Sequence, residues 1–216
     1  NQLTSIETDN TLYTLTYDSF GNSSSVKAGN YTLASYTYNS KNGKLMGTTY
    51  GNGFTVTNVY DLLDRLIAVK YNNNVAYTVT YNGSGAVSCI SDVLSGRSTD
   101  YEYDSLGRLI RAEQYITATG ISLLKTENGY DTYGRAKSSK YQVNGKTQSY
   151  SVLYQNSSNL ISSFNSYLDG DEWLNTEFTY DSLDRLDTKF VHLNGFSKTD
   201  IGSGISGGSR GKLQKN

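Results

Sequence analysis

One stretch recurs along the chain: Tyr103-Asp104-Ser105-Leu106-Gly107-Arg108-Leu109-Ile110. Close copies begin at Tyr60 and Tyr180, and more divergent copies cover most of the remaining sequence. With the leading tyrosine as the anchor, the copies start at positions 17, 38, 60, 81, 103, 130, 154 and 180. The steps between them are 21, 22, 21, 22, 27, 24 and 26 residues. Such a regular spacing indicates a tandem array of one supersecondary unit.

The composition predicts that this unit is built from strands. Tyr, Thr and Val favour pleated strands, and the frequent Gly, Asn, Asp and Ser favour turns. The chain has 216 residues, of which 36% are hydrophobic and 20 are tyrosine, and it contains no proline. We therefore predict an all-β fold.

Each repeat reads as two strands and two turns. Residues 31–38 and 66–71 have the length and composition of strands, and residues 75–81 lead into the next tyrosine. The motif supplies one turn, since Asp or Asn after the tyrosine can bond the backbone ahead of it. Residues 50–53, 72–74 and 143–146 supply the other turn as hairpin connections. In the longer repeats we expect extended connections, such as residues 117–120 and 169–172.

The array is expected to fill residues 1–196, in about eight units. Residues 197–216 are rich in Gly and Ser and predict a flexible tail or linker. The first residues show no signal-peptide pattern and resemble the second strand of a later unit, which suggests a fragment of a longer array.

Charge and chemistry exclude several function classes. The net charge is −1, without a basic stripe, so nucleic-acid binding is not expected. No apolar run of 18 residues is present, so no membrane span is expected. His192 and Cys89 are the only residues of their types and stand outside any catalytic or zinc motif. We read His192 as a strand or surface residue and Cys89 as a small buried strand residue.

The motif Tyr-Asp-x-x-Gly-Arg-Leu at this spacing resembles the YD repeat of the Rhs family. That family includes bacterial polymorphic toxins, wall-associated proteins, the C components of insecticidal toxin complexes, and teneurins. The resemblance covers roughly residues 1–190 and implies a continuous curved or spiralling antiparallel sheet, a partial β-shell. It also implies a bacterial protein that is secreted or located at the cell surface, and a full-length shell that encloses or presents a C-terminal effector. Toxin shells usually end in a core motif containing Pro and Asp, and this chain has no Pro.

Geometry limits what a fragment of this size can enclose. Sixteen strands at a spacing of ~4.8 Å span an arc of roughly 75 Å. A closed ring of that arc, with strands tilted by about 40°, has a backbone diameter of about 30 Å. An effector of ~100 residues, with a radius of gyration near 13 Å, does not fit inside such a ring. The fragment is expected to form a wall, not a container.

The motif residues are therefore candidates for structural roles. Tyrosine combines a broad ring for cross-strand packing with a hydroxyl, and we hypothesise a ladder of stacked motif tyrosines. The motif arginine can bond turn carbonyls or pair with the aspartate of its own or a neighbouring motif, forming a second ladder. The structural motif positions are Tyr17, Asp18, Gly21, Tyr38, Gly43, Tyr60, Asp61, Arg65, Tyr81, Gly85, Tyr103, Asp104, Gly107, Arg108, Tyr130, Asp131, Gly134, Arg135, Tyr154, Tyr180, Asp181 and Arg185.

No catalytic residue, cofactor or metal site is expected. Residues 169–172 resemble the start of a calcium loop but lack its closing glutamate. The expected partners are neighbouring repeats of a parent protein and an enclosed effector. Two alternatives stay open: exposed tyrosines that bind cell-surface glycans, and exposed sheet edges that pair with another copy. An enzyme is the third and least favoured reading.

Overall fold

The computed structural model describes residues 2–155 and 158–194. Within these residues the chain forms 17 strands and no helix, so the all-β prediction is confirmed. Accordingly, no described segment is a helix of the length and apolarity needed to cross a membrane. The predicted tail at 197–216, and the end of the array at residue 196, lie outside the described residues.

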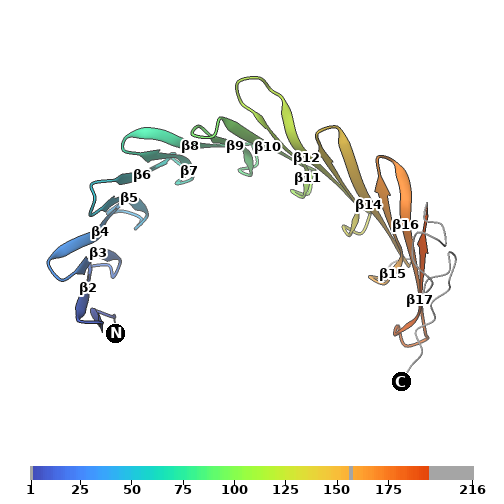
Figure 1. Ribbon diagram of the computed structural model, residues 1–216, viewed down its shortest axis with the longest axis horizontal. Helices are drawn as coiled ribbons and strands as arrows, with labels where there is room; N and C mark the ends of the chain where they lie inside the picture. The colour runs from blue at the N-terminus through green and yellow to red at the C-terminus, as the bar shows by residue number, and fades with distance from the viewer. Residues whose placement is uncertain (1, 156–157, 195–216) are drawn as a thin grey trace. The chain divides into compact units, whose positions relative to one another are not determined.

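The described residues fall into two compact units, divided between Ser98 and Thr99. Strands of the first unit have four to eight residues (Figure 1). They are β1 (Ser5–Thr8), β2 (Thr11–Tyr17), β3 (Ser23–Ala28), β4 (Tyr31–Tyr38), β5 (Leu45–Tyr50), β6 (Thr55–Tyr60), β7 (Leu66–Tyr71), β8 (Asn74–Tyr81) and β9 (Val87–Asp92). The strands predicted at 31–38 and 66–71 are β4 and β7, with the same bounds.

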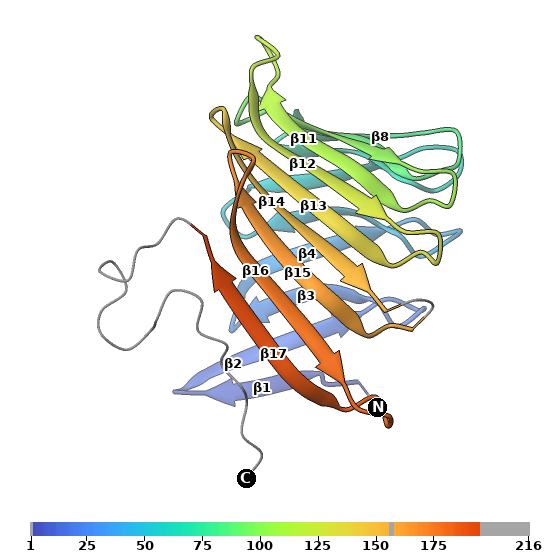
Figure 2. The ribbon, with the colours of Figure 1, turned by 90° about the vertical axis from the view of Figure 1, so that its right-hand side faces the viewer.

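The second unit has longer strands, of seven to ten residues, which lie side by side in Figure 2. They are β10 (Arg97–Tyr103), β11 (Leu109–Ile116), β12 (Ser122–Tyr130), β13 (Ala136–Val143), β14 (Lys146–Tyr154), β15 (Ile161–Leu168), β16 (Asp171–Tyr180) and β17 (Leu186–Leu193).

In each unit the strands follow one another in an antiparallel sheet, each pairing with the next along the chain. In the first unit, for example, Val59 pairs with Ala68 and Tyr77 with Asp92. Successive connections of such a sheet lie alternately at the two ends of its strands. The turns that begin at a motif tyrosine, here called motif turns, therefore lie at one end of the strands. The hairpins between motifs, here called linking turns, lie at the other end.

The linking turns are mostly tight. Both central residues have positive φ at Asp9–Asn10 (45° and 65°), Asn72–Asn73 (46° and 68°), Asn144–Gly145 (49° and 76°) and Asp169–Gly170 (51° and 97°). This is the type I′ geometry that matches the twist of the flanking strands. The hairpins predicted at 72–74 and 143–146 are confirmed. The extended connection predicted at 169–172 is wrong, because Asp169–Gly170 is a tight turn and Asp171 already begins β16.

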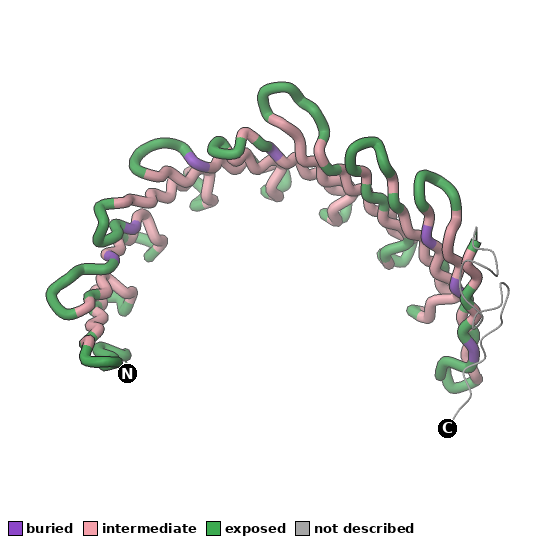
Figure 3. The backbone as a smooth tube through the Cα atoms, viewed as in Figure 1, coloured by how far each residue is buried: buried purple, intermediate pink, exposed green. Residues whose placement is uncertain are grey.

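Each sheet is a single layer among the described residues. Ala34 and Ala76 are the only hydrophobic side chains there that are buried. Figure 3 shows half-buried strands between exposed turns at both edges. The stability of such a sheet has to come from backbone ladders and cross-strand contacts, since there is no thick apolar core.

Candidate functional site: the motif turns

The aspartate of each motif organises its turn through one carboxylate oxygen. Oδ1 of Asp61 accepts hydrogen bonds from the backbone N–H groups of Leu63 and Arg65, both at 2.9 Å. The backbone closes the same turn, since the Asp61 N–H donates to the Arg65 carbonyl at 2.9 Å. The same pattern holds for Asp104, Asp131 and Asp181, and Asp18 repeats it.

The second carboxylate oxygen pairs with the motif arginine of the same turn. Nε and Nη2 of Arg108 lie 2.7 and 2.6 Å from Oδ2 of Asp104. Arg65, Arg135 and Arg185 make the same pair with Asp61, Asp131 and Asp181. Of the alternatives raised by the sequence, pairing within the motif is thus the one found in all four turns. Arg135 also donates to the carbonyl of Ser158, in the following motif turn.

A left-handed residue ends the four motif turns that carry the aspartate–arginine pair. Gly107 has φ of 78° and Gly134 of 85°, while Asp64 and Asp184 reach 60° at the equivalent position. Glycine adopts this conformation without strain, and aspartate tolerates it better than most residues. Gly21, Gly43 and Gly85 are also left-handed, with φ of 88°, 70° and 86°.

The motif tyrosine ties each turn to the preceding repeat. The hydroxyl of Tyr130 donates to the carbonyl of Leu109 at 3.0 Å, and Leu109 is the first strand residue after the preceding motif turn. The same bond recurs from Tyr17 to Leu3, Tyr38 to Ser23, Tyr60 to Leu45, Tyr81 to Leu66, Tyr154 to Ala136 and Tyr180 to Ile161, at 2.7 to 3.0 Å. Tyr103 ends β10 and begins the turn of Asp104.

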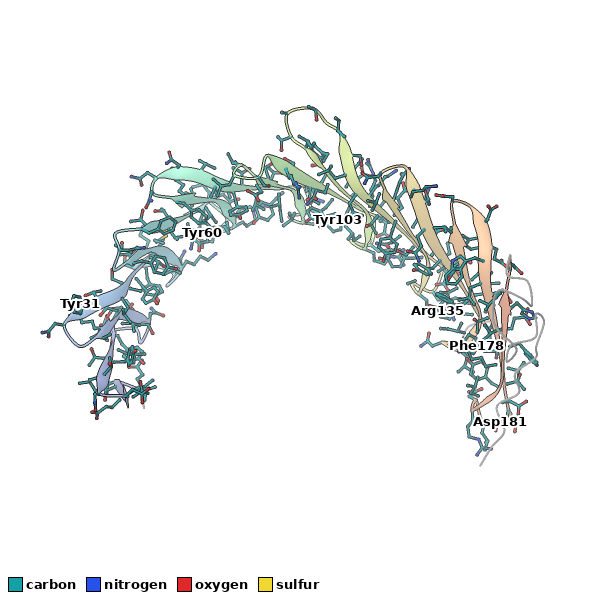
Figure 4. The ribbon with its side chains drawn as sticks, viewed as in Figure 1. Tyr31, Tyr60, Tyr103, Arg135, Phe178 and Asp181 are labelled. Atoms are coloured by element: carbon teal, nitrogen blue, oxygen red, sulfur yellow. The ribbon has the colours of Figure 1, made fainter. Side chains whose placement is uncertain are left out.

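The arginine of one motif also covers the tyrosine ring of the next. The guanidinium carbon of Arg65 lies 4.3 Å from the ring centroid of Tyr81, and that of Arg108 lies 4.4 Å from Tyr130. Arg135 lies 4.2 Å from Tyr154. The predicted ladder of stacked tyrosines is therefore replaced, among the described ring contacts, by alternating arginine and tyrosine. Figure 4 labels Tyr60, Tyr103, Arg135 and Asp181 among the motif residues.

Two parts thus form what we call the tyrosine clamp. The carbonyl of the first strand residue after a motif turn accepts the hydroxyl of the next motif tyrosine, and the motif cation lies on its ring. Each clamp joins two consecutive repeats through a hydrogen bond and a cation–π contact.

Divergent motifs keep parts of the clamp. Asn22 replaces the arginine and donates to Oδ2 of Asp18 at 3.0 Å. Lys44 supplies the cation over Tyr60, 5.1 Å from the ring centroid. Asn82 replaces the aspartate, and its side-chain oxygen accepts the N–H groups of Ser84 and Ala86 at 3.1 and 3.0 Å. The turn geometry therefore survives the loss of the negative charge.

A β-bulge that was not predicted from the sequence accompanies the motif turn. The pairing shifts at the tyrosine itself: Val59 opposes Ala68, but Tyr60 opposes Leu66. The same shift occurs at Tyr17, Tyr38, Tyr81, Tyr130, Tyr154 and Tyr180. A bulge leaves one strand residue unpaired and increases the local twist.

Hydrogen bonding within the turn lowers the pKa of several motif carboxylates. Hydrogen bonds from the Arg108 side chain and backbone lower the pKa of Asp104 below its ordinary value. The backbone N–H of Arg65 and then its side chain lower the pKa of Asp61. Desolvation opposes the shift at Asp131, but the bonds from Arg135 outweigh it, and its pKa is also lowered. A carboxylate held this way is an acceptor in the turn, not a proton donor.

Each unit also carries cross-strand contacts that the sequence alone did not indicate. In the first unit, the rings of Tyr50, Phe54, Tyr71 and Tyr77 form a chain of contacts with centroids 5.5 to 6.1 Å apart. In the second unit, Tyr150 stacks on Phe164 at 5.6 Å. The second unit also has a row of alternating charges, in which Arg111 bonds Glu102 and Glu113, and Glu127 contacts Lys125 and Lys140.

A shallow apolar groove of about 450 Å³ lies on the second unit. Tyr130, Tyr150, Val152 and Phe164 supply most of its apolar wall. Asn128, Ser138 and Ser139 add polar atoms, and the Ser139 hydroxyl already donates to Oδ1 of Asn128.

The other residues singled out from the sequence lie in ordinary strand positions. His192 is in β17 opposite Asn175. Cys89 is in β9 and half-buried, so the expectation of full burial is wrong, because the single-layer sheet leaves its strands partly exposed. Asp169 pairs with Lys146 at 2.8 Å across a hairpin. Among the described residues, no group of three or more His, Cys, Asp or Glu is placed to hold a metal ion.

No protein-family model matches the chain, and no curated protein matches it. Solved structures do resemble it. A component of the Photorhabdus luminescens Tc holotoxin pore matches with a TM-score of 0.57 and 15% identity, over 85% of this chain and 10% of the other.

Two structures of the TcdB2–TccC3 complex match similarly. One has a TM-score of 0.56 and 13% identity, over 85% of this chain and 11% of the other. The second, without its hypervariable C-terminal region, has a TM-score of 0.54 and 14% identity, over 86% of this chain and 14% of the other. The chain therefore spans about a tenth of the length of the structures it resembles. As the resemblance to YD repeats predicts, the chain is a tandem-repeat segment with the fold found in part of these toxin-complex structures.

Proposed function

We propose that this chain is a non-catalytic wall segment of a YD-repeat shell in a large secreted or cell-surface bacterial protein. In its full-length form that protein encloses or presents a C-terminal effector. The observation that carries the proposal is the hydroxyl bond of the tyrosine clamp, which joins a motif tyrosine to the preceding backbone strand or segment seven times in the described residues. At four of these tyrosines the cation of the clamp is also present. A contact repeated in this way builds an extended sheet and does not single out one catalytic position.

The chemistry of the motif supports a structural role. The aspartates are committed to turn N–H groups and arginines, and their lowered pKa values keep them unprotonated at neutral pH. A general acid or base needs a pKa near the working pH. The fold likeness to Tc toxin proteins supports a place in a toxin shell, and the enclosed effector is part of the same proposal.

Protease protection in the full-length polypeptide tests the enclosure. We expect the region downstream of the repeats to resist proteolysis in the intact protein and to become sensitive in a Tyr60→Phe, Tyr130→Phe, Tyr154→Phe triple variant, which lacks three clamps. Tyr31→Phe is the control, since Tyr31 is 80% exposed and lies in β4 outside the motif. A downstream region that is digested equally fast in all these proteins would refute the enclosure.

Glycan binding is the second candidate, and the structure narrows where it can occur. Seven of the eight motif tyrosines donate their hydroxyls to backbone carbonyls, so these hydroxyls are not available as donors to sugars. The groove at Tyr150 and Phe164 offers a stacked pair beside amide and hydroxyl groups. Titration with wall polysaccharides is expected to change tyrosine fluorescence in the native chain but not in Tyr150→Ala if this groove binds them. An unchanged signal in the native chain would discard this candidate.

A further inference from the structure

The first motif turn keeps the carboxylate of its motif but has no motif cation. In the other four motifs with an aspartate, Oδ2 of that aspartate pairs with Nε and Nη2 of the motif arginine. In the first motif Asn22 stands in place of the arginine and supplies one bond, from its Nδ2 to Oδ2 of Asp18 at 3.0 Å. The short amide side chain ends at the carboxylate and leaves the rest of the arginine's place empty.

The next motif tyrosine, Tyr38, keeps the hydroxyl bond of the clamp but has no cation on its ring. Its hydroxyl donates to the Ser23 carbonyl at 2.9 Å. Four later motif tyrosines have a lysine or arginine over the ring: Tyr60, Tyr81, Tyr130 and Tyr154. Within residues 2–155 and 158–194, Tyr38 has no such contact. The clamp between the first two motifs therefore lacks only its cation.

This combination of a free anion and a free ring occurs at one place in the described part of the chain. The motifs that begin at Tyr81 and Tyr154 also lack a cation, but Asn82 and Gln155 stand there in place of the aspartate. The motif at Tyr38 has Asn39 at that position and uses Lys44 as its cation. Only the first motif has an aspartate without an arginine or lysine beside it.

A cavity of about 310 Å³ lies between the first two motif turns. The three residues of the incomplete clamp, Asp18, Asn22 and Tyr38, all line it. Tyr36 adds a second aromatic side chain, and Ser24 adds a hydroxyl. Among the described residues that line this cavity there is no lysine or arginine. The space that an arginine fills in the complete clamps is thus open to a ligand here.

The cavity carries a negative charge that the described residues do not balance. Hydrogen bonds from the Asn22 side chain and from turn N–H groups lower the pKa of Asp18, so its carboxylate is ionised at neutral pH. Burial and then the charge of Asp18 raise the pKa of the Tyr38 hydroxyl. Both directions agree with a carboxylate close to this tyrosine and without a cation between them. A carboxylate beside an aromatic ring favours a cationic ligand.

We propose that Asp18 and Tyr38 form a binding site for a guanidinium group, which we call the vacant clamp. A planar guanidinium donates to Oδ2 of Asp18 while its face lies on the Tyr38 ring, as Arg65, Arg108 and Arg135 do in the complete clamps. The ammonium group of lysine is a compact point charge without a flat face. The inference does not depend on the proposed shell, because a wall segment without an effector has the same site.

Amide chemical shifts of the isotope-labelled chain, titrated with ethylguanidinium, test the site. We expect saturable shifts at Asp18, Asn22 and Tyr38, with a Kd of about 1–10 mM. Ethylammonium is the matched point-charge ligand and is expected to bind at least about fivefold more weakly. The peptide acetyl-Gly-Arg-Gly-amide identifies the source of the ligand, with citrulline in place of arginine as its neutral control. Binding of the arginine peptide assigns the site to an arginine of another polypeptide, and binding of ethylguanidinium alone assigns it to a small guanidine compound.

Three protein variants locate the binding. Asp18→Asn is expected to weaken it about tenfold through loss of a charged hydrogen bond. The turn itself should persist in this variant, because Asn82 accepts the same two N–H groups in its own motif. Asn22→Arg places a guanidinium in the site within the chain, so it is expected to abolish binding and to raise the urea unfolding midpoint. Asp9→Asn removes a carboxylate from an exposed linking turn and is expected to bind like the native chain.

Three results would overturn the proposal. The first is the absence of saturable shifts at tens of millimolar ethylguanidinium. The second is equal binding by the native chain and by Asp18→Asn or Asn22→Arg, which would place the ligand elsewhere. The third is equally tight binding of ethylammonium, which would show a general attraction of cations. None of these results affects the protease test of enclosure.

Discussion

The repeats of the first unit and those of the second differ in length but share one motif turn. In the first unit consecutive motif tyrosines are 21 or 22 residues apart, whereas in the second unit the steps are 27, 24 and 26. The distance from the motif tyrosine to the next strand stays at six or seven residues throughout. The extra residues go mainly into the strands, which reach ten residues in β16.

The comparison shows that the repeat has a nearly constant length at the motif turn and a variable length toward the linking turn. The clamp and the aspartate set the geometry of the motif turn, so that turn tolerates at most one additional residue. The linking turns of consecutive repeats contact one another in ways that differ from turn to turn, such as the Thr55 N–H donating to Asn72 or Lys146 pairing with Asp169, and the strands that lead to them can lengthen in register. Both units have a chain of aromatic ring contacts, and the second unit adds a row of alternating charges.

The largest loss of folding stability is expected from a substitution in a linking turn of the first unit. A Cβ on Gly51 would lie 2.2 Å from the carbonyl oxygen of Thr32, which is backbone and cannot move aside cheaply. Gly51→Ala should destabilise β4 and β5 by about 2–3 kcal/mol, as overpacking does. Amide hydrogen exchange of these strands measures it. Gly83→Ala is the control, because nothing lies within 4 Å of its Cβ, and equal effects of the two changes would contradict the account.

A smaller effect on the free energy of unfolding is expected at the left-handed position of the motif turn. Its sign should differ between the two units. Gly134→Ala in the second unit should cost about 1–2 kcal/mol, since φ is 85° there. Asp64→Gly in the first unit, where φ is 60°, should be neutral or slightly stabilising in urea unfolding. If both variants lost the same stability, the shared geometry of the motif turns would be in doubt.

Removing one clamp hydroxyl should have the same modest effect in either unit. Tyr60→Phe and Tyr130→Phe each lose a hydrogen bond to a backbone carbonyl, at 3.0 Å in both cases. We expect a loss of about 1 kcal/mol from each, by urea unfolding or exchange of the adjacent strands. Tyr31→Phe should change nothing measurable. A large loss in one unit and none in the other would show that the clamp is not a shared device.

The smallest change in folding stability per site is expected when a motif aspartate is protonated. The pKa values of Asp61 and Asp104 are lowered in the folded chain, so the unfolded chain binds more protons near its ordinary carboxyl pKa. Their stabilising contribution is therefore complete above about pH 4 and is lost as the pH falls further. Asp104→Asn should flatten this dependence while keeping the turn, because Asn82 already accepts the same two N–H groups. Unfolding midpoints between pH 2 and 6 measure it, and an unchanged pH profile in the variant would contradict the assignment.

The repeat pattern was sufficient to predict the strand pairs, the motif turns and several linking turns. Tyrosine, aspartate and the left-handed glycine are local features, and Tyr103, Asp104 and Gly107 stand at the positions where a turn needs them. The bulge at Tyr60 could not be predicted, because it depends on the register of the next strand. The bond from Tyr130 to Leu109 spans 21 residues, and the cover of Arg108 over Tyr130 spans 22, so neither follows from local sequence. The extended connection at residues 169–172 was predicted wrongly, because Asp169, Gly170 and Asp171 have the composition of a loop when the strand pairing is unknown.

The most direct test of the clamp is a double-mutant cycle in the second unit, with Arg108→Gln and Tyr130→Leu measured singly and together. Arg108 lies over the Tyr130 ring, so we predict a coupling free energy of about 0.5–1 kcal/mol. Arg185→Gln with Tyr130→Leu is the reference cycle and should be additive, because no contact joins that pair among the described residues. Additive effects in the Arg108–Tyr130 cycle would contradict the claim that arginine and tyrosine join consecutive repeats.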